Sequence, residues 1–422
     1  MEKICKMCKV LFLGIFIVNN AFAQQLTARA SDPIEKNEIL SAKEVKQLEK
    51  EIKSLTKNAQ ALALKVRNAE FGPGDQDEQQ ESENPFEKKK VISKSYSVDA
   101  KDKLSINNQH GEVKIELWSK NEIKVDVTIT GYANSEKKAQ ELINGVDIKE
   151  QRDGDMISLK TLIESENGGN WGGNWNWSWK SRGDEKSNGK RGVEINYMIY
   201  MPKTNALIVA NRYGSTKIPT FSAPLKISSN YGSFTCDKLS GGDKNIQVQY
   251  GSGNIKQMDD GVLNVAYSSL GIDKADNLHL TNNYGSMNLH DVNNLDANIQ
   301  YSSGKIGVIR ESGKIYISYS DGVQLTEMPK TLKSLDIKSN YTSVKLPVNG
   351  DCNADFDVTI NYANFRIPEG KATFSVNSDN DSDENGKMGW KSTKIYKGKI
   401  GKGAGTKIVI RSNYGGVKFT DN

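Results

Sequence analysis

A Tyr-Gly-Ser triplet recurs along this chain and is the first pattern in it that suggests chemistry, because a serine beside a base is a nucleophile. The triplet begins at Tyr213, Tyr231, Tyr250 and Tyr284. The sequence contains only three His, and none of them recurs with the triplet as a general base. It also lacks a Gly-x-Ser-x-Gly elbow, a His-Glu-x-x-His helix and a phosphate-binding loop. We therefore interpret the triplet as a structural corner, and we expect no enzymatic activity and no cofactor.

A polysaccharide-active enzyme is the alternative, since lyases and hydrolases of this kind occur on coiled β-folds. Such enzymes need carboxylates or basic residues from neighbouring turns of the coil to converge on one face. The outward positions of this chain carry scattered Ser, Asn, Lys and Asp. This pattern favours a binding protein over an enzyme.

Four of the six tryptophans lie within nine residues of a Gly- and Asn-rich insertion at 164–191, namely Trp171, Trp175, Trp177 and Trp179. Exposed aromatic rings between short polar side chains stack on sugars or bases, and they anchor protein interfaces. We predict that these four side chains bind a ligand, with a glycan as the first expectation. The alternative is an irregular loop whose indole rings fill a groove over a β-face.

The acidic run from Asp379 to Gly386 alternates oxygen-bearing side chains, as calcium loops do. It departs from the helix–loop–helix calcium loop, because Glu384 replaces the required glycine and Trp390 stands where a bidentate glutamate belongs. We interpret the run as a solvated insertion and expect no metal site, with calcium as the alternative.

Two cysteines, Cys236 and Cys352, lie beyond the amino-terminal region and are 116 residues apart. In an oxidising compartment two such residues can form a disulfide. Distant residues of a repeat array rarely come within the ~6 Å that a disulfide requires. We therefore expect two buried thiols and keep the disulfide as the alternative.

The elements that must position these residues follow from a tyrosine repeat. Tyrosines recur at intervals of 17 to 22 residues, each opens a triplet of small residues, and a last copy closes the chain. The repeat tyrosines are Tyr213, Tyr231, Tyr250, Tyr267, Tyr284, Tyr301, Tyr319, Tyr341, Tyr362 and Tyr414. Because the tyrosines share the phase of the apolar residues before them, we predict that their rings form an internal ladder at one corner.

Apolar and polar residues alternate on both sides of each tyrosine, as in Leu225 and Ile227 before Tyr231, and Phe234 and Cys236 after it. This period of two indicates a strand, a corner and a second strand, each with one dry face. A unit of about 20 residues cannot bury its dry face alone and must stack on its neighbours. The sequence predicts an all-β protein, a parallel β-solenoid of 17–22-residue repeats that is regular over 211–422.

Residues 91–210 follow the same pattern less regularly, and His110 occupies the position of the tyrosine. Alternation predicts strands over 123–129 and 193–199. Glu136 to Ile143 reads as a short helix with Ser135 as its N-cap. We expect an irregular β-rich section that leads into the solenoid.

The amino terminus has the layout of a secretory signal peptide over 1–23, with lysines, a short apolar run and a small-residue cleavage site. Residues 24–70 contain a heptad stripe that predicts one amphipathic helix over 38–68. This helix either joins copies into a homo-oligomer or packs on its own domain. A polar linker follows at 71–90.

The net charge of +5 over 422 residues is too small for a nucleic-acid-binding surface. No second apolar run is long enough to span a bilayer, so we expect no transmembrane segment after cleavage. The signal peptide predicts export to the periplasm, the cell surface or the medium.

The stretches from Ile195 to Pro202, from Leu207 to Ile218 and from Asn107 to Ile115 are similar to those of the bacterial putative-adhesin domain of unknown function. The resemblance covers roughly 95–420 and implies an exported, repetitive β-solenoid. Its motifs are structural, so it implies no catalytic residues.

Taken together, these patterns indicate a non-enzymatic, adhesin-like β-solenoid that presents an extended surface to an envelope component, a cell-surface component or a glycan. A polysaccharide-active enzyme and a periplasmic structural or stress-response scaffold, oligomerising through residues 38–68, are the alternatives.

Overall fold

The computed structural model describes residues 86–164, 192–348, 352–378 and 392–421. The chain divides into two compact units, Met1–Glu81 and Ser82–Asn422, and the described residues belong to the second. The signal peptide, the heptad helix, the four tryptophans and the acidic run lie outside the described residues and stay predictions.

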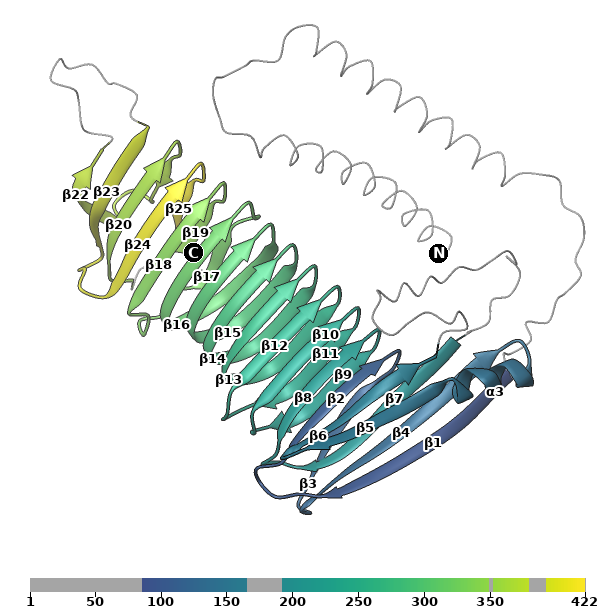
Figure 1. Ribbon diagram of the computed structural model, residues 1–422. Coiled ribbons are helices and arrows are strands. Elements are labelled where there is room, and N and C mark those ends of the chain that lie inside the picture. Colours follow the sequence, from purple (N-terminus) through teal and green to yellow (C-terminus); the bar gives the residue numbers. More distant parts are fainter. Residues whose placement is uncertain (1–85, 165–191, 349–351, 379–391, 422) are drawn as a thin grey trace, which may run out of the picture. The chain divides into compact units, whose positions relative to one another are not determined.

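The second unit is a parallel β-solenoid with two faces, as the sequence predicts (Figure 1). In each rung the strand before the tyrosine joins one face, and the strand after it joins the other. Strands of successive rungs pair in parallel and in register, as Ile227 does with both Val209 and Ile246. Sequential segments from 206 to 347 are therefore coiled and do not form hairpins with one another.

The first face extends through the strands that precede each corner. In spatial order it contains β5 (Val146–Asp153), β6 (Met156–Ile163), β2 (Lys103–Gln109), β8 (Ala206–Arg212), β10 (Leu225–Asn230), β12 (Lys244–Gln249), the later parts of β13 (Ser252–Ala266), β14 (Ser269–Asn283), β15 (Ser286–Gln300) and β16 (Ser303–Ser318), then β18 (Ser334–Asn340), β24 (Thr406–Asn413), β20 (Ala354–Asn361), β23 (Thr393–Ile400) and β22 (Ala372–Asn377).

The second face is built from the strands that follow each corner. It contains β1 (Phe86–Ser97), β4 (Glu122–Ala133), β7 (Gly192–Pro202), β3 (Val113–Trp118), β9 (Ser215–Phe221), β11 (Ser233–Leu239), the first parts of β13 to β16, then β17 (Val323–Glu327), β19 (Val344–Pro347), β25 (Val417–Thr420) and β21 (Phe365–Arg366).

The core lies between the two faces, where inward side chains form columns along the solenoid axis. Cys236 stands in such a column between Ile218 and Ile255. Burial raises the pKa of its thiol to about 12, so the residue is a small apolar filler and not a reactive group. Cys236 and Cys352 are both free thiols in this structure.

The repeat tyrosines form a ladder at one corner, but the prediction that their rings lie inside is wrong. Every one of them has a φ between 49° and 60°. A left-handed residue breaks the pleat, so the side chain no longer follows the alternation of the strand before it. The preceding residue of the same phase, such as Ser229 or Asn282, stays fully buried, while the tyrosine itself is turned outward.

The small residue after each tyrosine is required by the close stacking of the corners. A Cβ on Gly232 would lie 1.9 Å from the carbonyl oxygen of Gly214. At Ser268, Ser302, Ser320 and Thr342 a hydroxyl takes part in the corner instead. The Ser302 Oγ accepts the Gly285 amide at 3.3 Å and donates to the Gln300 carbonyl at 2.7 Å.

The chain end does not follow the sequential order of the rungs. β24 lies between β18 and β20, and β25 lies between β19 and β21. The last repeat copy is therefore inserted into the stack one rung before the copy of Tyr362. This arrangement gives the carboxy-terminal strands a partner on both sides.

Antiparallel strands close both ends of the coil. β1, β4 and β7 pair antiparallel at the amino-terminal end, and β20, β23 and β22 do so at the other. Helix α3 (Glu136–Asn144) packs on β4 and β1, where Gly131 leaves room for it. The predicted cap is confirmed, because the Ser135 Oγ accepts the Lys138 amide at 3.4 Å.

The close approach at the corner gives a stability test. We expect Gly232→Ala to lower the free energy of unfolding by about 1–3 kcal/mol, because a backbone oxygen blocks the added methyl group. Gly253→Ala is the matched control, since its Cβ would meet only ordinary contacts at 3.4 Å. Urea denaturation measures both variants, and equal stabilities would contradict this account of the corner.

Candidate binding surface

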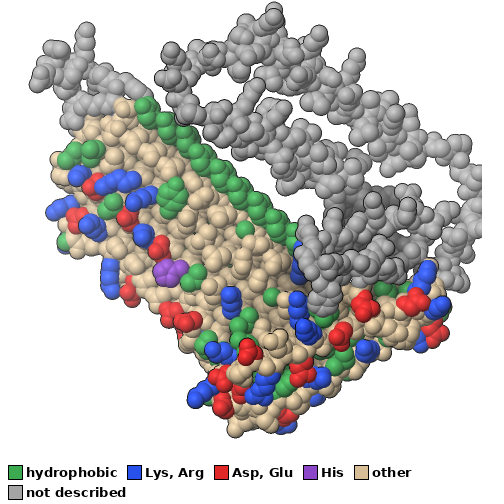
Figure 2. All heavy atoms as spheres, in the orientation of Figure 1, with side chains coloured by type: hydrophobic (Ala, Val, Ile, Leu, Met, Phe, Trp, Pro, Cys, Tyr) green, Lys and Arg blue, Asp and Glu red, His purple; other side chains and the backbone are tan. Residues whose placement is uncertain are grey.

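A row of stacked aromatic rings runs along one edge of the solenoid, and we call it the ladder. It consists of His110, Tyr213, Tyr231, Tyr250, Tyr267, Tyr284, Tyr301, Tyr319, Tyr341, Tyr414 and Tyr362, in spatial order. Neighbouring ring centroids are 4.7–5.1 Å apart, which matches the spacing between hydrogen-bonded strands. Figure 2 shows the ladder as a continuous apolar stripe along the solenoid.

The ladder exposes ring edges and not ring faces. Each tyrosine in it is 41–52% exposed. From Tyr231 onward neighbouring ring planes differ by only 2–12°, so the faces of the inner rings cover one another. What a partner can reach is therefore a regular row of ring edges, which carry the positive side of the aromatic quadrupole.

Uncharged residues, all polar except Ala266, border the middle of the ladder on both sides. Over five rungs the residue before the tyrosine is Asn230, Gln249, Ala266, Asn283 or Gln300. The residue two positions after the tyrosine is always serine in these rungs, namely Ser233, Ser252, Ser269, Ser286 and Ser303. Figure 2 shows no charged side chain against the middle of the stripe in this view. The surface can thus form hydrogen bonds without repelling a partner by charge.

The two ends of the ladder differ from its middle. At the amino-terminal end the Arg212 guanidinium lies 4.9 Å from the Tyr213 ring centroid and 5.7 Å from that of Tyr231. At the other end amide side chains form their own row, with Asn361 donating to Asn413 at 2.5 Å and Asn413 donating to Asn340 at 2.7 Å. Both arrangements hold the residues beside the rings in fixed positions.

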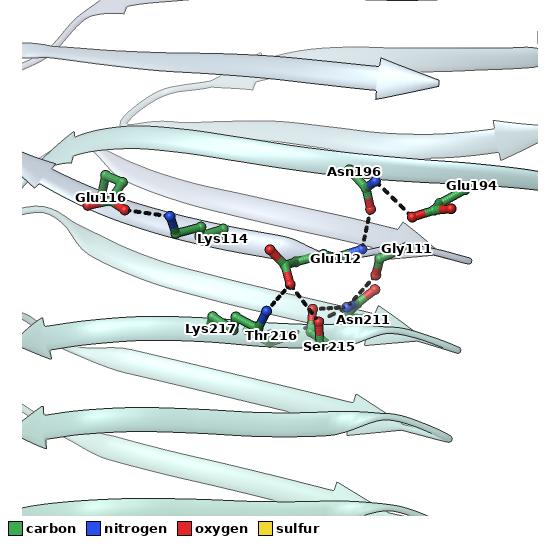
Figure 3. A network of polar contacts seen from close by, with 10 residues as sticks. All are labelled: Gly111, Glu112, Lys114, Glu116, Glu194, Asn196, Asn211, Ser215, Thr216 and Lys217. Carbon is green, nitrogen blue, oxygen red and sulfur yellow. Dashed lines mark hydrogen bonds and ion pairs between the residues drawn. The ribbon is translucent and has the colours of Figure 1, made fainter. Parts of the chain in front are cut away.

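A polar network joins the irregular section to the first regular rung, directly beside the start of the ladder (Figure 3). The Glu112 carboxylate accepts from Ser215 Oγ at 3.0 Å and from Lys217 Nζ at 2.5 Å. The Glu112 amide donates to Asn196 Oδ1 at 2.7 Å, and Asn211 Nδ2 donates to the Gly111 carbonyl at 3.1 Å. Each polar group bonds to a neighbouring strand, so the network serves to connect β3, β7 and β9.

A shallow groove of about 530 Å³ lies on the first face, where residues of adjacent rungs converge. His279 Nδ1 is 3.8 Å from Asp296 Oδ2, and Lys314 Nζ is 3.9 Å from the same oxygen. The sequence did not indicate this row. All three side chains are about half exposed or more, so the Lys314–Asp296 ion pair and the His279–Asp296 contact are solvated and have little energetic weight.

Lys244 is a further charged residue whose position the sequence did not reveal. Its side chain is buried, and its ammonium donates to the Ala223 carbonyl at 2.9 Å and to the Gly242 carbonyl at 3.2 Å. Burial lowers the pKa of this lysine. The carbonyls belong to the turn opposite the tyrosine corner, so Lys244 stabilises that turn.

Comparison with protein families shows that residues 101–396 match the model of the Toastrack DUF4097 family. This match covers well over half of the chain. The protein belongs to the Toastrack family. The Toastrack name denotes a domain of unknown function, so the match establishes the fold and family and leaves the ligand open.

Two solved structures are similar to this Toastrack chain at low identity. One is a "putative cell adhesion protein" from Clostridium sporogenes, with 12% identity, a TM-score of 0.19, and coverage of 79% of this chain and 100% of that one. The other is a "putative adhesin" from Bacteroides fragilis, with 14% identity, a TM-score of 0.29, and coverage of 78% and 97%. No curated protein matches the chain. The family match carries the assignment.

The predicted site residues have different outcomes in this Toastrack structure. Trp171, Trp175, Trp177 and Trp179 lie outside the described residues. The ladder tyrosines are brought together, and His110 extends their row as the sequence suggested. Within the described ranges there is no cluster of metal-ligating side chains, and no helix there is long and apolar enough to cross a membrane.

The outward position of the ladder can be tested at Tyr267. We expect Tyr267→Asn to be more stable than Tyr267→Val by about 1–2 kcal/mol, because Asn tolerates a left-handed backbone and a β-branched residue does not. An internal ring would give the opposite order, since Val suits a core and Asn does not. Thermal denaturation of the two variants decides between these outcomes.

The Glu112 network predicts a pH dependence. Burial alone would raise the pKa of Glu112, but hydrogen bonds from Lys217 and Ser215 outweigh it and lower the pKa. The carboxylate therefore stabilises the fold above its unfolded pKa, and this contribution is lost as the pH falls through the folded pKa.

We expect Glu112→Gln to cost a few tenths of a kcal/mol near neutral pH, because the pair is partly exposed, and to cost less at about pH 3, where protonation weakens the pair. Glu116→Gln is the control, since Glu116 bonds only to Lys114 of its own strand in Figure 3. Denaturation curves at both pH values measure the effect. A loss that is the same at both values would show that the charge of Glu112 has no part in it.

Proposed function

We propose that this protein is an exported, non-enzymatic adhesin-like solenoid that binds a component of the cell envelope, of a neighbouring cell, or a glycan. The observation that carries the proposal is the ladder, a continuous and exposed aromatic row on a rigid scaffold. Exposed apolar patches on a monomer rarely exceed about 300–600 Å² without a binding role. Ten half-exposed tyrosines, at about 200 Å² each, present about 1,000 Å².

The repetition of the ladder argues against catalysis at this surface. A catalytic site needs different groups that converge on one reacting atom. The ladder instead offers the same ring edge at every tyrosine rung and the same serine over the five middle rungs, which suits a long partner bound by many weak contacts. The names of the two similar structures point in the same direction.

Binding and turnover can be separated in one experiment. The secreted protein is applied to a glycan array and to envelope fragments, and the products are analysed. We expect retention without cleavage. Release of product would contradict a non-enzymatic function and favour the polysaccharide-active enzyme.

The ladder itself is tested with Tyr250→Asn, Tyr267→Asn and Tyr284→Asn combined, because Asn keeps the left-handed corner. We expect this variant to lose at least about tenfold in retention, which corresponds to 1.4 kcal/mol. Tyr316→Ser is the matched control, since Tyr316 is 39% exposed but stands outside the ladder. Unchanged retention in the triple variant would exclude the ladder as the binding surface.

A further inference from the structure

The geometry of the ladder restricts which partner it can bind. Sugars pack their C–H groups on the face of an aromatic ring, where the electron density is high. The inner rings of the ladder use both faces for one another, at centroid distances of 4.7–5.1 Å. A glycan at this surface would therefore bind through hydroxyl groups and not through the faces of the inner rings. The partner must recognise ring edges and hydroxyl groups that repeat at the spacing of β-strands.

We propose that the partner at the ladder is the ladder of a second copy of this chain. This inference rests on the proposed function, since it names the partner of the same surface. An identical ladder has the required repeat by construction, so the tyrosine hydroxyl groups of one row meet equivalent hydroxyl groups of the other.

The chemistry of the surface is complementary to itself. A phenol hydroxyl both donates and accepts hydrogen bonds, and so does a serine hydroxyl, so two identical rows can pair. In the five middle rungs, those of Tyr231 to Tyr301, the residue before the ring and the residue two positions after it are uncharged. Two copies therefore approach without the like-charge repulsion that opposes most self-association.

The size of the surface is sufficient for a stable pair. The tyrosines of the ladder present about 1,000 Å² per copy, and a standard protein interface needs about 800 Å² per partner. A pair related by a two-fold axis is the commonest way in which such a surface closes. We place this axis across the ladder, so that the two solenoids run antiparallel.

The antiparallel arrangement follows from the shape of the unit. Figure 1 shows β1, β4, β7 and α3 gathered at one broad end. An antiparallel pair keeps the two broad ends apart, and it places each serine row opposite the serine row of the other copy. With the axis at the rung of Tyr267, Ser269 faces its own equivalent, and Ser252 of each copy faces Ser286 of the other.

Sedimentation of the full protein tests the pair. We expect twice the chain mass for the unchanged protein and for Tyr316→Ser. The combined Tyr250→Asn, Tyr267→Asn and Tyr284→Asn variant should sediment at the mass of one chain. An unchanged protein of single mass, or a triple variant of double mass, would overturn the inference, the latter because association then uses another surface such as residues 38–68.

Charge complementation tests the orientation and does not depend on loss alone. One variant combines Ser252→Asp, Ser269→Asp and Ser286→Asp, and a second combines Ser252→Lys, Ser269→Lys and Ser286→Lys. We expect each to have single mass alone, because like charges then face each other, and the mixture to recover double mass. A mixture that stays at single mass would overturn the inference.

These experiments separate the inference from the proposed function. A protein of single mass that still shows ladder-dependent retention on the array would refute self-pairing and leave the proposed function standing. A protein that pairs through the ladder and releases product from a polysaccharide would refute the non-enzymatic function alone.

Discussion

The distance between parallel hydrogen-bonded strands is the constraint on which the surface of this protein depends. Each rung repeats the same corner, and the backbone fixes neighbouring corners about 4.8 Å apart. Aromatic rings at equivalent positions must then stack, because 4.7–5.1 Å between centroids is a favourable offset distance. The ladder is thus a consequence of the backbone, because the distance between strands sets the distance between the exposed rings.

The corner must change the direction of the chain, and it must also let neighbouring corners stack closely. The tyrosine accepts a left-handed backbone and so reverses the chain, at a cost that its stacking on neighbours offsets. At most rungs the residue after it either has no side chain, as at Gly232, or uses a hydroxyl to satisfy an adjacent amide, as at Ser302. Ala363 after Tyr362 is the exception, at the last ring of the ladder. The repeat therefore conserves conformation and hydrogen bonding at the corner, while the strands between corners vary freely within their alternation.

Most of the fold could be predicted from the sequence, and the predictions that were wrong or missing have physical reasons. The alternation around Tyr231 and the 17–22-residue period predicted strands, rungs and a coil. The same alternation placed the rings inside, since a period of two assumes an unbroken pleat and contains no sign of a positive φ at Tyr213 or Tyr267. The position of β24 between β18 and β20 could not be predicted either. The tyrosine spacing gives the order of the repeats along the chain, but it does not give their order in the stack. The row of His279, Asp296 and Lys314 becomes visible only once the register is known.

The ends of the solenoid explain why its edge is the place where a partner would act. A parallel coil presents unpaired backbone groups at both ends, and such ends extend by pairing with other chains unless they are protected. Here β1, β4 and β7 turn antiparallel at one end and β20, β23 and β22 at the other, while β24 is enclosed within the stack. Because these antiparallel strands close the ends, the coil has a fixed number of rungs. The two broad faces carry mixed charges, and the turns opposite the ladder are closed by groups such as Lys244. The ladder is then a long surface on which the same exposed ring edge recurs at every tyrosine rung. A surface of that kind selects partners by their repeat distance before it selects them by shape.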